Sequence, residues 1–273
     1  MTLIASLVNG SARPKHHAPC HARGSGAMSG TVRRCRVSLL PRRHPSSEHP
    51  VGRTKVHRGV RASVAAMGAP TRWVTDTDEG HSQWYIERFR AMAAEGVDLG
   101  GEARLVDAIV RPGSRVLDAG CGPGRVGGVL HDRGHDVVGV DVDPELIAAA
   151  LEDHPGPQWV VADLADLDLP AAGISEPFDA AVVAGNVLAF VAPGTEPDVL
   201  RRIAAHLVPG GVALVGFGTE RGYALEDFDA DLAGAGFELE HRFATWDLRP
   251  WQQDAEFAVS VLRLPASIHD EFS

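Results

Sequence analysis

The sequence has few cysteines, few aromatic residues and, beyond residue 66, no lysine at all. Its three cysteines, Cys20, Cys35 and Cys121, are too few for a disulfide framework and form no paired C-x-x-C metal spacing, which favours a reducing compartment. No apolar run approaches the ~20 residues that a membrane span needs. The mildly apolar first ten residues are not preceded by a basic segment, so we expect no secretory signal. These absences together predict a cytoplasmic protein without a membrane partner.

Charge is distributed very unevenly along the chain. Residues 1–66 hold twelve basic residues and one acid, a net charge of +11, whereas residues 67–273 hold fourteen Arg and 35 acids, a net charge of −21. The first segment is rich in Arg, His and Pro and has neither a helical nor a strand period, so we predict a disordered arm over 1–66. The acidic balance of 67–273 argues against nucleic acid as its partner, because a field of that sign repels phosphates.

Three interpretations of the arm compete. A basic tail for nucleic acid, a transit peptide and an over-extended gene start all fit an Arg-rich, acid-poor composition. Ordinary protein composition begins at Met67, which favours the gene-start interpretation. The first aromatic residue of the whole chain is Trp73, which lies beyond the arm and weakens the case for base stacking.

From residue 81 onward, segments with helical spacing alternate with short apolar runs. Two helical segments come first and form a candidate N-terminal lid over about 81–110. Alternation of strands with helices then predicts an α/β fold with a parallel sheet covered on both faces, and two last strands with alternating polarity predict an antiparallel hairpin. We expect strands at 115–120, 135–141, 159–163, 178–185, 212–218, 237–248 and 255–264, and helices at 81–96, 102–110, 125–134, 144–153, 196–211 and 224–236.

The strongest chemical signal is a glycine-rich run, D-A-G-C-G-P-G over 118–124, between a predicted strand and a predicted helix. Glycine lets the backbone turn sharply and approach a ligand closely. The helix after Gly124 offers unpaired N–H groups and a positive dipole end to an anion. Such a loop alone also fits a dinucleotide-binding fold or a tight turn, so its context has to decide.

Two further acids supply that context, because Asp141 and Asp163 end the next two predicted strands. An acid at the end of the second strand accepts hydrogen bonds from ribose hydroxyls, as it does in nicotinamide oxidoreductases. An NAD(P)-dependent oxidoreductase stays an alternative, but Arg125 stands where a G-x-G-x-x-G loop needs its last glycine. A catalytically silent partner subunit is the other alternative, which an intact set of cofactor residues disfavours.

Five runs, VLDAGCGPGRVG, VVGVDVDPELIAAA, VVADLADLDLP, FDAAVVAGNVL and LVPGGVALVGFG, together resemble class I S-adenosylmethionine-dependent methyltransferases. The resemblance covers about residues 81–264 and is nearest to small single-domain bacterial methyltransferase-domain proteins. It implies S-adenosyl-L-methionine as cofactor. It also implies a Rossmann-like, doubly wound, seven-stranded sheet that is mostly parallel, with an antiparallel C-terminal hairpin.

The resemblance further implies which residues of the glycine-rich loop serve the cofactor. Gly120, Cys121, Gly122 and Gly124 correspond to the loop around the methionine part, and Asp118 to the acid that steadies the loop or the amino group. Asp118 could also simply cap the loop. Cys121 is more simply a small packing residue than a nucleophile, since only its backbone position matters.

Five later residues complete the implied cofactor site. Asp141 corresponds to the ribose-binding acid, with Val142 beside the adenine. Asp163 corresponds to the acid at the adenine amino group, with Leu164 packing on the ring, and Asn186 lies where the family approaches the sulfonium and the acceptor. We expect no metal, because the histidines beyond residue 67 have no cysteine partner at a ligand spacing.

The acceptor pocket is predicted to be rich in aromatic side chains. Ligands bind outside the carboxyl ends of the strands in an open α/β sheet, which selects Tyr85, Phe190, Phe217 and Tyr223 as lining candidates. Tyr85 could equally belong to a helix core, and Phe217 and Tyr223 could merely pack a strand against its helix. We expect methyl transfer to a small molecule; the run AGNV at 184–187, in place of N-P-P-[YF], argues against the amide- and base-N-methylating branch.

Overall fold

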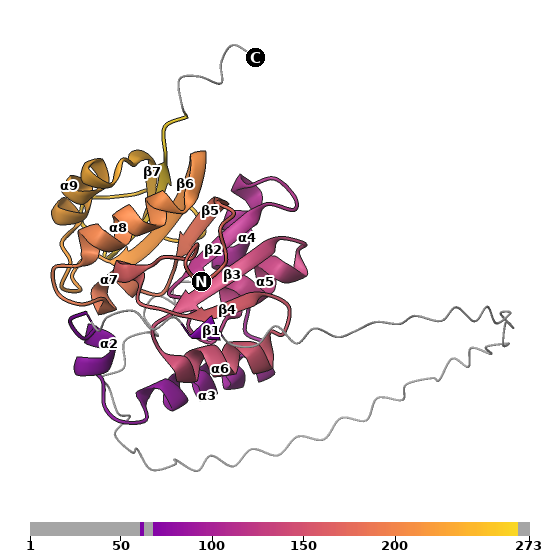
Figure 1. Cartoon of the computed structure of the whole chain (residues 1–273). Coiled ribbons are helices and arrows are strands. Elements are labelled where there is room, and N and C mark those ends of the chain that lie inside the picture. Colours follow the sequence, from indigo (N-terminus) through magenta and orange to yellow (C-terminus); the bar gives the residue numbers. More distant parts are fainter. Residues whose placement is uncertain (1–60, 63–67, 267–273) are drawn as a thin grey trace, which may run out of the picture. The chain divides into compact units, whose positions relative to one another are not determined.

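Eight strands form one sheet in the order β1-β4-β3-β2-β5-β6-β8-β7 (Figure 1). The structure is a computed structural model that describes residues 61–62 and 68–266. Neighbouring strands pair in parallel except at β8, which runs antiparallel to both β6 and β7. The strands are β1 (Arg61–Ala62), β2 (Arg115–Ala119), β3 (Asp136–Asp141), β4 (Gln158–Val161), β5 (Phe178–Val183), β6 (Leu207–Gly218), β7 (Glu238–Phe243) and β8 (Phe257–Arg263). Strands β2 to β8 are the seven that the sequence predicts, so the predicted fold class is confirmed.

Six helices lie within the helical segments that the sequence predicts. Three short elements in the described part were not predicted, because three or four residues are too few to show a period. The predicted helices are α3 (His81–Ala94), α4 (Gly101–Ile109), α5 (Arg125–Asp132), α6 (Pro144–Asp153), α8 (Glu196–Ala205) and α9 (Leu225–Ala235). The short elements are α2 (Arg72–Thr75), η1 (Leu164–Asp166) and α7 (Val187–Phe190).

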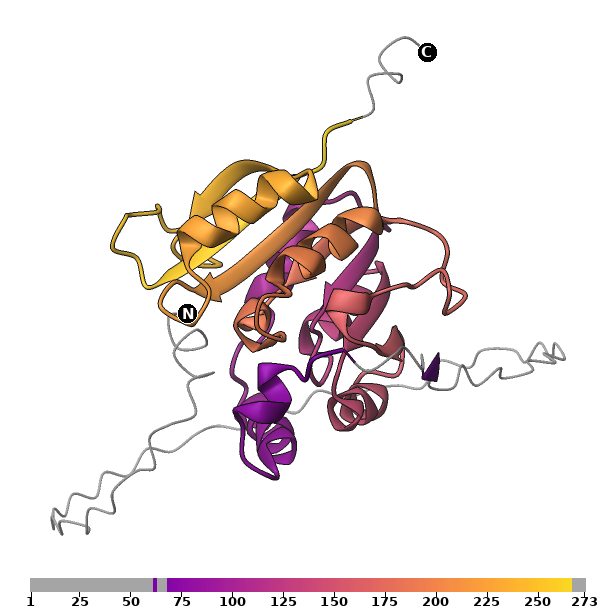
Figure 2. The same cartoon turned by 60° about the vertical axis from the view of Figure 1, so that its left-hand side comes forward.

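Helices cover both faces of the sheet, as Figures 1 and 2 show. On one face, α8 and α9 bury Leu200, Ile203 and Phe228 in the larger hydrophobic cluster. On the other face, α4 and α5 bury Val106 and Leu130 in a second cluster. Because helices cover the central strands on both sides, the sequences of these strands are nearly continuous apolar runs. Their positions can therefore be predicted from the sequence.

The strand β6 begins earlier than predicted, and its first five residues contain a proline and two glycines. Leu207 pairs with Phe178 of β5, and the register then shifts before Val212 pairs with Ala180. Pro209 has no backbone N–H to donate to the neighbouring strand. The pairing of β6 with β5 is therefore irregular at the start of β6. The predicted helix 196–211 therefore ends at Ala205.

The two-residue strand β1 lies inside the 1–66 segment predicted as a disordered arm. It pairs in parallel with Val160 and Val161 of β4 and forms the edge of the sheet. The rest of that segment lies outside the described residues, so the domain boundary at 66/67 stays a prediction. Within the described ranges, no helix is both long and apolar enough to cross a membrane.

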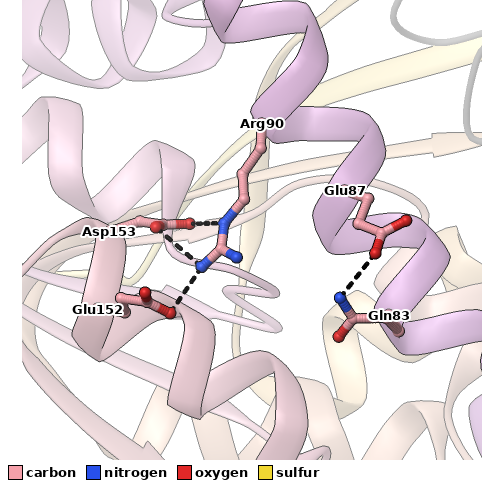
Figure 3. A network of polar contacts seen from close by, with 5 residues as sticks. All are labelled: Gln83, Glu87, Arg90, Glu152 and Asp153. Atoms are coloured by element: carbon pink, nitrogen blue, oxygen red, sulfur yellow. Dashed lines mark hydrogen bonds and ion pairs between the residues drawn. The ribbon is translucent and has the colours of Figure 1, made fainter.

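Helix α3 is tied to the end of α6 by one arginine (Figure 3). The Arg90 guanidinium donates to Asp153 at 2.8 Å and to Glu152 at 2.9 Å, while Gln83 and Glu87 bond to each other one turn away on α3. The carboxylates raise the pKa of Arg90. These exposed contacts hold α3 beside α6, at the end of the sheet where β3 and β4 lie (Figure 1).

Candidate functional site: a cavity at the carboxyl ends of the central strands

A cavity lies where β2, β3, β4 and β5 end, the place at which open α/β sheets bind ligands. The glycine loop, two strand-end acids and an aromatic wall surround it. The lining residues are Thr71, Trp73, Tyr85, Gly120, Gly122, Asp141, Val142, Leu146, Asp163, Leu164, Ala184, Gly185, Val187, Phe190 and Val191. Six of the ten predicted cofactor residues are among them.

The loop after β2 can be built only with glycine at its first position. Gly120 has φ +77, and a Cβ there would lie 2.3 Å from Cγ2 of Val187. Its N–H donates to the carbonyl of Val140 at the end of β3, at 2.8 Å, so the loop is held against the neighbouring strand. At Gly122, φ is +54 and a Cβ would point toward the Tyr85 ring at 3.6 Å. A side chain at position 120 would thus clash with Val187, whereas one at position 122 would occupy the space between the loop and Tyr85.

Asp141 connects this loop to the end of β3. Its Oδ2 accepts from the Gly122 N–H at 2.8 Å, and its Oδ1 accepts from the Asp143 N–H at 3.0 Å. Burial raises the pKa of Asp141 to about 6, against the opposing effect of the two N–H donors. Because each carboxylate oxygen has a further lone pair, the side chain can still accept hydrogen bonds from a ligand hydroxyl.

Asp118 lies behind the loop and does not line the cavity. It is 1% exposed, and its Oδ2 accepts from the N–H of Gly127 in the first turn of α5 at 2.8 Å. The carboxylate therefore satisfies one of the free N–H groups of that helix, so that group is not available to a ligand. Burial raises the pKa of Asp118 to about 7. This contact holds the start of α5, and the predicted roles of Asp118 toward the loop or the amino group stay predictions.

Cys121 and Gly124 also face away from the cavity. Cys121 packs in a small cluster with Ile147 and Trp159, where burial raises the pKa of its thiol well above the usual value. Gly124 has φ +83, and a Cβ there would lie 2.8 Å from the Trp159 ring. Both residues therefore shape the loop through packing, and the Cys121 thiol stays protonated.

The end of β4 supplies the second acid of the cavity. Asp163 accepts from the N–H of Ala165 at 2.9 Å and so caps the short helix η1. Leu164, the first residue of η1, is 5% exposed and lies beside it in the cavity wall. With Val142 after β3, these two side chains give the cavity one polar and two apolar contacts at its β3–β4 end.

Asn186 is placed next to the cavity but not in its lining. It is 1% exposed, has φ +64, and its Oδ1 accepts from the Gly218 N–H at 2.7 Å. The side chain thus joins the end of β5 to the end of β6. Its neighbours Gly185 and Val187 line the cavity in its place.

The structure brings two of the four aromatic acceptor-pocket candidates to the cavity. Tyr85 and Phe190 line it, whereas Phe217 and Tyr223 do not. Phe217 packs edge-to-face on Phe228 of α9 with ring centroids 5.1 Å apart. The Tyr223 hydroxyl donates to Asp231 at 2.7 Å, also on α9. Both side chains belong to the core between β6 and α9, the alternative that the sequence left open.

Seven lining residues are not among the predicted site residues, and they include Thr71 and Trp73 on the segment before α3. The Trp73 ring packs edge-to-face on Tyr85 at 5.6 Å and on Phe190 at 5.5 Å, and its Nε1 donates to Asp143 Oδ2 at 2.8 Å. Thr71 and Trp73 lie in a polar segment without helical or strand periodicity. The one sequence feature that could have indicated them is an isolated tryptophan among polar residues. We call Trp73, Tyr85 and Phe190 the aromatic wall.

Metal-ligating side chains do not gather in the described part of the chain, since no three His, Cys, Asp or Glu residues there are placed to hold an ion. The two histidines spaced four apart, His131 and His135, serve different neighbours. His135 bonds to Asp107 at 3.0 Å, and the His131 ring lies against Gly156.

Comparisons with known proteins connect this geometry to a family. The family model for a methyltransferase domain matches residues 116–211. A TehB-like SAM-dependent methyltransferase from Corynebacterium glutamicum, known from its crystal structure, is 45% identical with a TM-score of 0.63, over 68% of this chain and 98% of that one. The chain belongs to the class I S-adenosylmethionine-dependent methyltransferases. The cofactor of this methyltransferase is S-adenosyl-L-methionine.

Curated relatives match shorter parts of the methyltransferase. The ribosomal protein L11 methyltransferase of Symbiobacterium thermophilum is 38% identical over 40% of this chain and 33% of its own length. The glycine N-methyltransferase of Rattus norvegicus is 29% identical over 59% of this chain and 58% of its own length. The chain therefore spans about a third to three fifths of these relatives, which differ in the acceptors that their names give.

The residues of the cavity fit that cofactor. The side-chain-free loop at Gly120 and Gly122 leaves room for the methionine part, and Asp141 keeps acceptor capacity for ribose hydroxyls. Burial raises the pKa of Tyr85 to about 12, so its hydroxyl is protonated at neutral pH and acts as a hydrogen-bond donor rather than a base.

Proposed function

We propose that this methyltransferase transfers the methyl group of S-adenosylmethionine to a small molecule bound against the aromatic wall. The observation that carries the proposal is the shared cavity, in which Gly120, Gly122, Asp141 and Asp163 meet Tyr85 and Phe190. The bound sulfonium supplies an electrophilic methyl carbon, so the protein mainly has to bind and orient the two reactants.

Each cofactor-facing residue has a distinct task in the proposal. Asp141 accepts hydrogen bonds from the ribose hydroxyls while its N–H donors keep the carboxylate in place. Asp163 bonds the adenine amino group, and Val142 and Leu164 hold the ring between apolar surfaces. Gly120 and Gly122 let the methionine part approach the backbone.

Several features support a small acceptor rather than a macromolecule. The aromatic wall offers apolar surface to a compact, partly apolar ligand. The net charge of −21 over residues 67–273 disfavours nucleic acid. Methyl transfer to an acceptor that is already a good nucleophile needs no general base. The protonated Tyr85 hydroxyl does not provide a general base.

The test is calorimetry with S-adenosylhomocysteine on the full chain and on Asp141→Ala. We expect the substitution to weaken binding more than tenfold, because the ribose loses its acceptor and the Gly122 N–H loses its partner. Asp227→Ala, which removes an exposed carboxylate on α9, is the matched control and should bind like the parent chain. Equal affinity of Asp141→Ala and the parent would contradict the assignment.

Two further measurements separate the alternatives. An oxidoreductase would be stabilised against heat by NADH, and we expect stabilisation by S-adenosylhomocysteine only. A silent partner subunit would bind S-adenosylmethionine without ever consuming it in the presence of a cell extract of small molecules. Consumption above the rate of the Asp141→Ala variant is the expected result.

A further inference from the structure

Arg221 is a half-buried arginine whose side chain has no partner among the described residues. Residues 67–273 contain fourteen arginines, and within the described ranges the guanidinium groups of eleven of them contact a carboxylate or an aromatic ring. The other three are Arg111 and Arg202, which are exposed, and Arg221. The adjacent Glu220 is exposed and forms no ion pair with Arg221. A guanidinium that loses part of its hydration without gaining a partner in the protein favours an anionic ligand.

The Arg221 side chain lies over the carboxyl end of β6. Its Cδ and Nε are 3.1 and 3.4 Å from the position that a Cβ on Gly218, the last residue of the strand, would occupy. The chain is anchored on both sides of Arg221, because the Thr219 hydroxyl donates to the Ala255 carbonyl at 3.0 Å and the Tyr223 hydroxyl donates to a carboxylate of α9 at 2.7 Å. The loop that carries Arg221 is therefore fixed at the edge of the sheet where open α/β folds bind ligands.

Asn186 provides a second unused donor beside this arginine. Its Oδ1 accepts from the Gly218 N–H at 2.7 Å, which fixes the orientation of the amide. Its Nδ2 has two N–H groups and no acceptor within the described part of the chain, yet it is not one of the fully buried atoms that lack a partner, so a ligand can reach it. Both side chains therefore adjoin Gly218, and their unused polar atoms are all donors.

These donors lie on the side of β5 away from the proposed cofactor residues. The sheet order places β4 and β3, whose ends supply Asp163 and Asp141, on one side of β5 together with β2, and it places β6 on the other side (Figure 1). Gly185, the neighbour of Asn186 in the chain, lines the cavity. An acceptor in the cavity can therefore extend past the end of β5 toward Arg221. An anionic group there is attracted by the guanidinium and also by the positive sulfonium of the bound cofactor.

We propose that Arg221 and Asn186 bind a carboxylate group of the methyl acceptor, so that the acceptor is a small carboxylic acid. A planar carboxylate matches the guanidinium fork and can accept a further hydrogen bond from the Asn186 amide. A cationic group would find no acceptor among the unused atoms of these two side chains. The rest of the acceptor lies in the cavity beside Gly185, next to the cofactor. The inference rests on the proposed function, since it assigns the chemical class of that acceptor.

The test compares the binding of benzoate with that of benzamide, which has nearly the same shape and no charge. Both are titrated by calorimetry into the full chain saturated with S-adenosylhomocysteine. This ligand lacks the sulfonium charge, so a preference for benzoate reports on the donors of the protein alone. We expect benzoate to bind about tenfold more tightly than benzamide, and we expect Arg221→Gln to remove this preference.

Two further variants complete the test. Arg202→Gln removes an exposed, unpaired arginine of α8, and as the matched control it should keep the full preference for benzoate. Asn186→Asp keeps an acceptor for the Gly218 N–H, and aspartate tolerates the positive φ of this position. Because the substitution replaces a donor by a negative charge, we expect it to weaken benzoate binding about tenfold and to leave benzamide binding within about twofold.

The cofactor also carries a carboxylate, and a second titration distinguishes the two sources. Methylthioadenosine lacks the amino acid part of S-adenosylhomocysteine. We expect Arg221→Gln to bind both nucleosides within about twofold of the parent chain. A tenfold loss for S-adenosylhomocysteine alone would assign Arg221 to the cofactor and overturn the inference.

Other outcomes separate the inference from the proposed function. Equal binding of benzoate and benzamide to the parent chain, no binding of either, or a preference that survives in Arg221→Gln would overturn the inference alone. Failure of the parent chain to bind S-adenosylhomocysteine would overturn the proposed function, and the inference with it.

Discussion

The Asp141 carboxylate holds the glycine loop and also lines the cavity. Its two oxygens accept from the N–H groups of Gly122 and Asp143, so the side chain links the glycine loop to the segment that follows β3. Burial nevertheless raises its pKa to about 6, which shows that desolvation outweighs these two donors. The residue is therefore close to its titration point in the mildly acidic range.

Cofactor affinity should depend on pH through this residue. In the proposed complex ribose hydroxyls donate to the ionised Asp141 carboxylate, so cofactor binding would lower the pKa of Asp141. By linkage, we then expect affinity to rise with pH through about 6 and to fall below it. We expect the dissociation constant of S-adenosylhomocysteine to increase up to about tenfold per pH unit below 6, measured by calorimetry at fixed ionic strength. Asp141→Asn should bind more weakly and with a flat profile between pH 5 and 7.5. A parent chain with a flat profile would argue against an ionised Asp141 in the complex.

At the scale of elements, α2 is held in place by contacts at both of its sides. Arg72 pairs with Glu196 at the start of α8, and Trp73 donates to Asp143 at the start of α6. Asp143 Oδ2 also accepts from the Ser82 hydroxyl of α3, while Oδ1 accepts from the Glu145 N–H and caps α6. One carboxylate thus fixes the aromatic wall relative to the loop that follows Asp141.

The link between Trp73 and Asp143 can be removed selectively. Asp143→Asn keeps the oxygen that caps α6 but replaces the acceptor of the Trp73 N–H, and Trp73→Phe keeps a ring but removes that N–H. We expect each variant to lose about 1–2 kcal/mol of unfolding free energy in denaturant titrations, since a hydrogen bond to a charged group is lost. The double variant should lose little more than either single one, because both remove the same contact. Additive losses would mean that the two residues act independently; Asp78→Asn, on the exposed turn before α3, is the control.

Which elements could be predicted from the sequence follows from their length and burial. Most of the longer strands and helices show their periods because they bury a continuous face. Strand β7, whose residues are exposed or half-buried, was found from its alternating polarity instead. The cavity-lining residues at the ends of β2, β3 and β4 could be predicted because the glycine-rich motif and the acids lie at strand ends. Thr71 and Trp73 were missed because they reach the cavity only through α2, four residues without a period. Phe217 and Tyr223 were misplaced because Phe228 and Asp231, far along the chain, determine which way they face.

At the scale of the whole molecule, the sequence boundary between the basic segment 1–66 and the acidic segment 67–273 lies a few residues after β1, the strand at the edge of the sheet. Of the basic segment, the structure describes the two-residue strand β1, whose residues pair with Val160 and Val161 of β4. The cavity lining begins at Thr71, after the segment. We therefore propose that residues 1–66 contribute little to folding or cofactor binding.

A chain that begins at Met67 tests this directly. We expect its melting temperature to match that of the full chain within about 2 °C and its affinity for S-adenosylhomocysteine to match within about twofold, because a two-residue edge strand adds few contacts. A chain that begins at residue 60 retains β1 and serves as the control. If only the longer version is stable, β1 is required to protect the edge of β4. A native protein whose N-terminal peptide maps before residue 60 would exclude the over-extended gene start.

The double attachment of α2 has a thermodynamic consequence. Because Arg72 and Trp73 are already engaged with α8 and α6, the aromatic wall loses its rotational and backbone freedom when the chain folds. If an acceptor binds there as proposed, it meets side chains that these contacts already order, so we expect the conformational entropy change of the wall on binding to be small. Such a rigid surface also selects by shape: a molecule that is too thick to lie against Trp73, Tyr85 and Phe190 cannot be accommodated by local rearrangement.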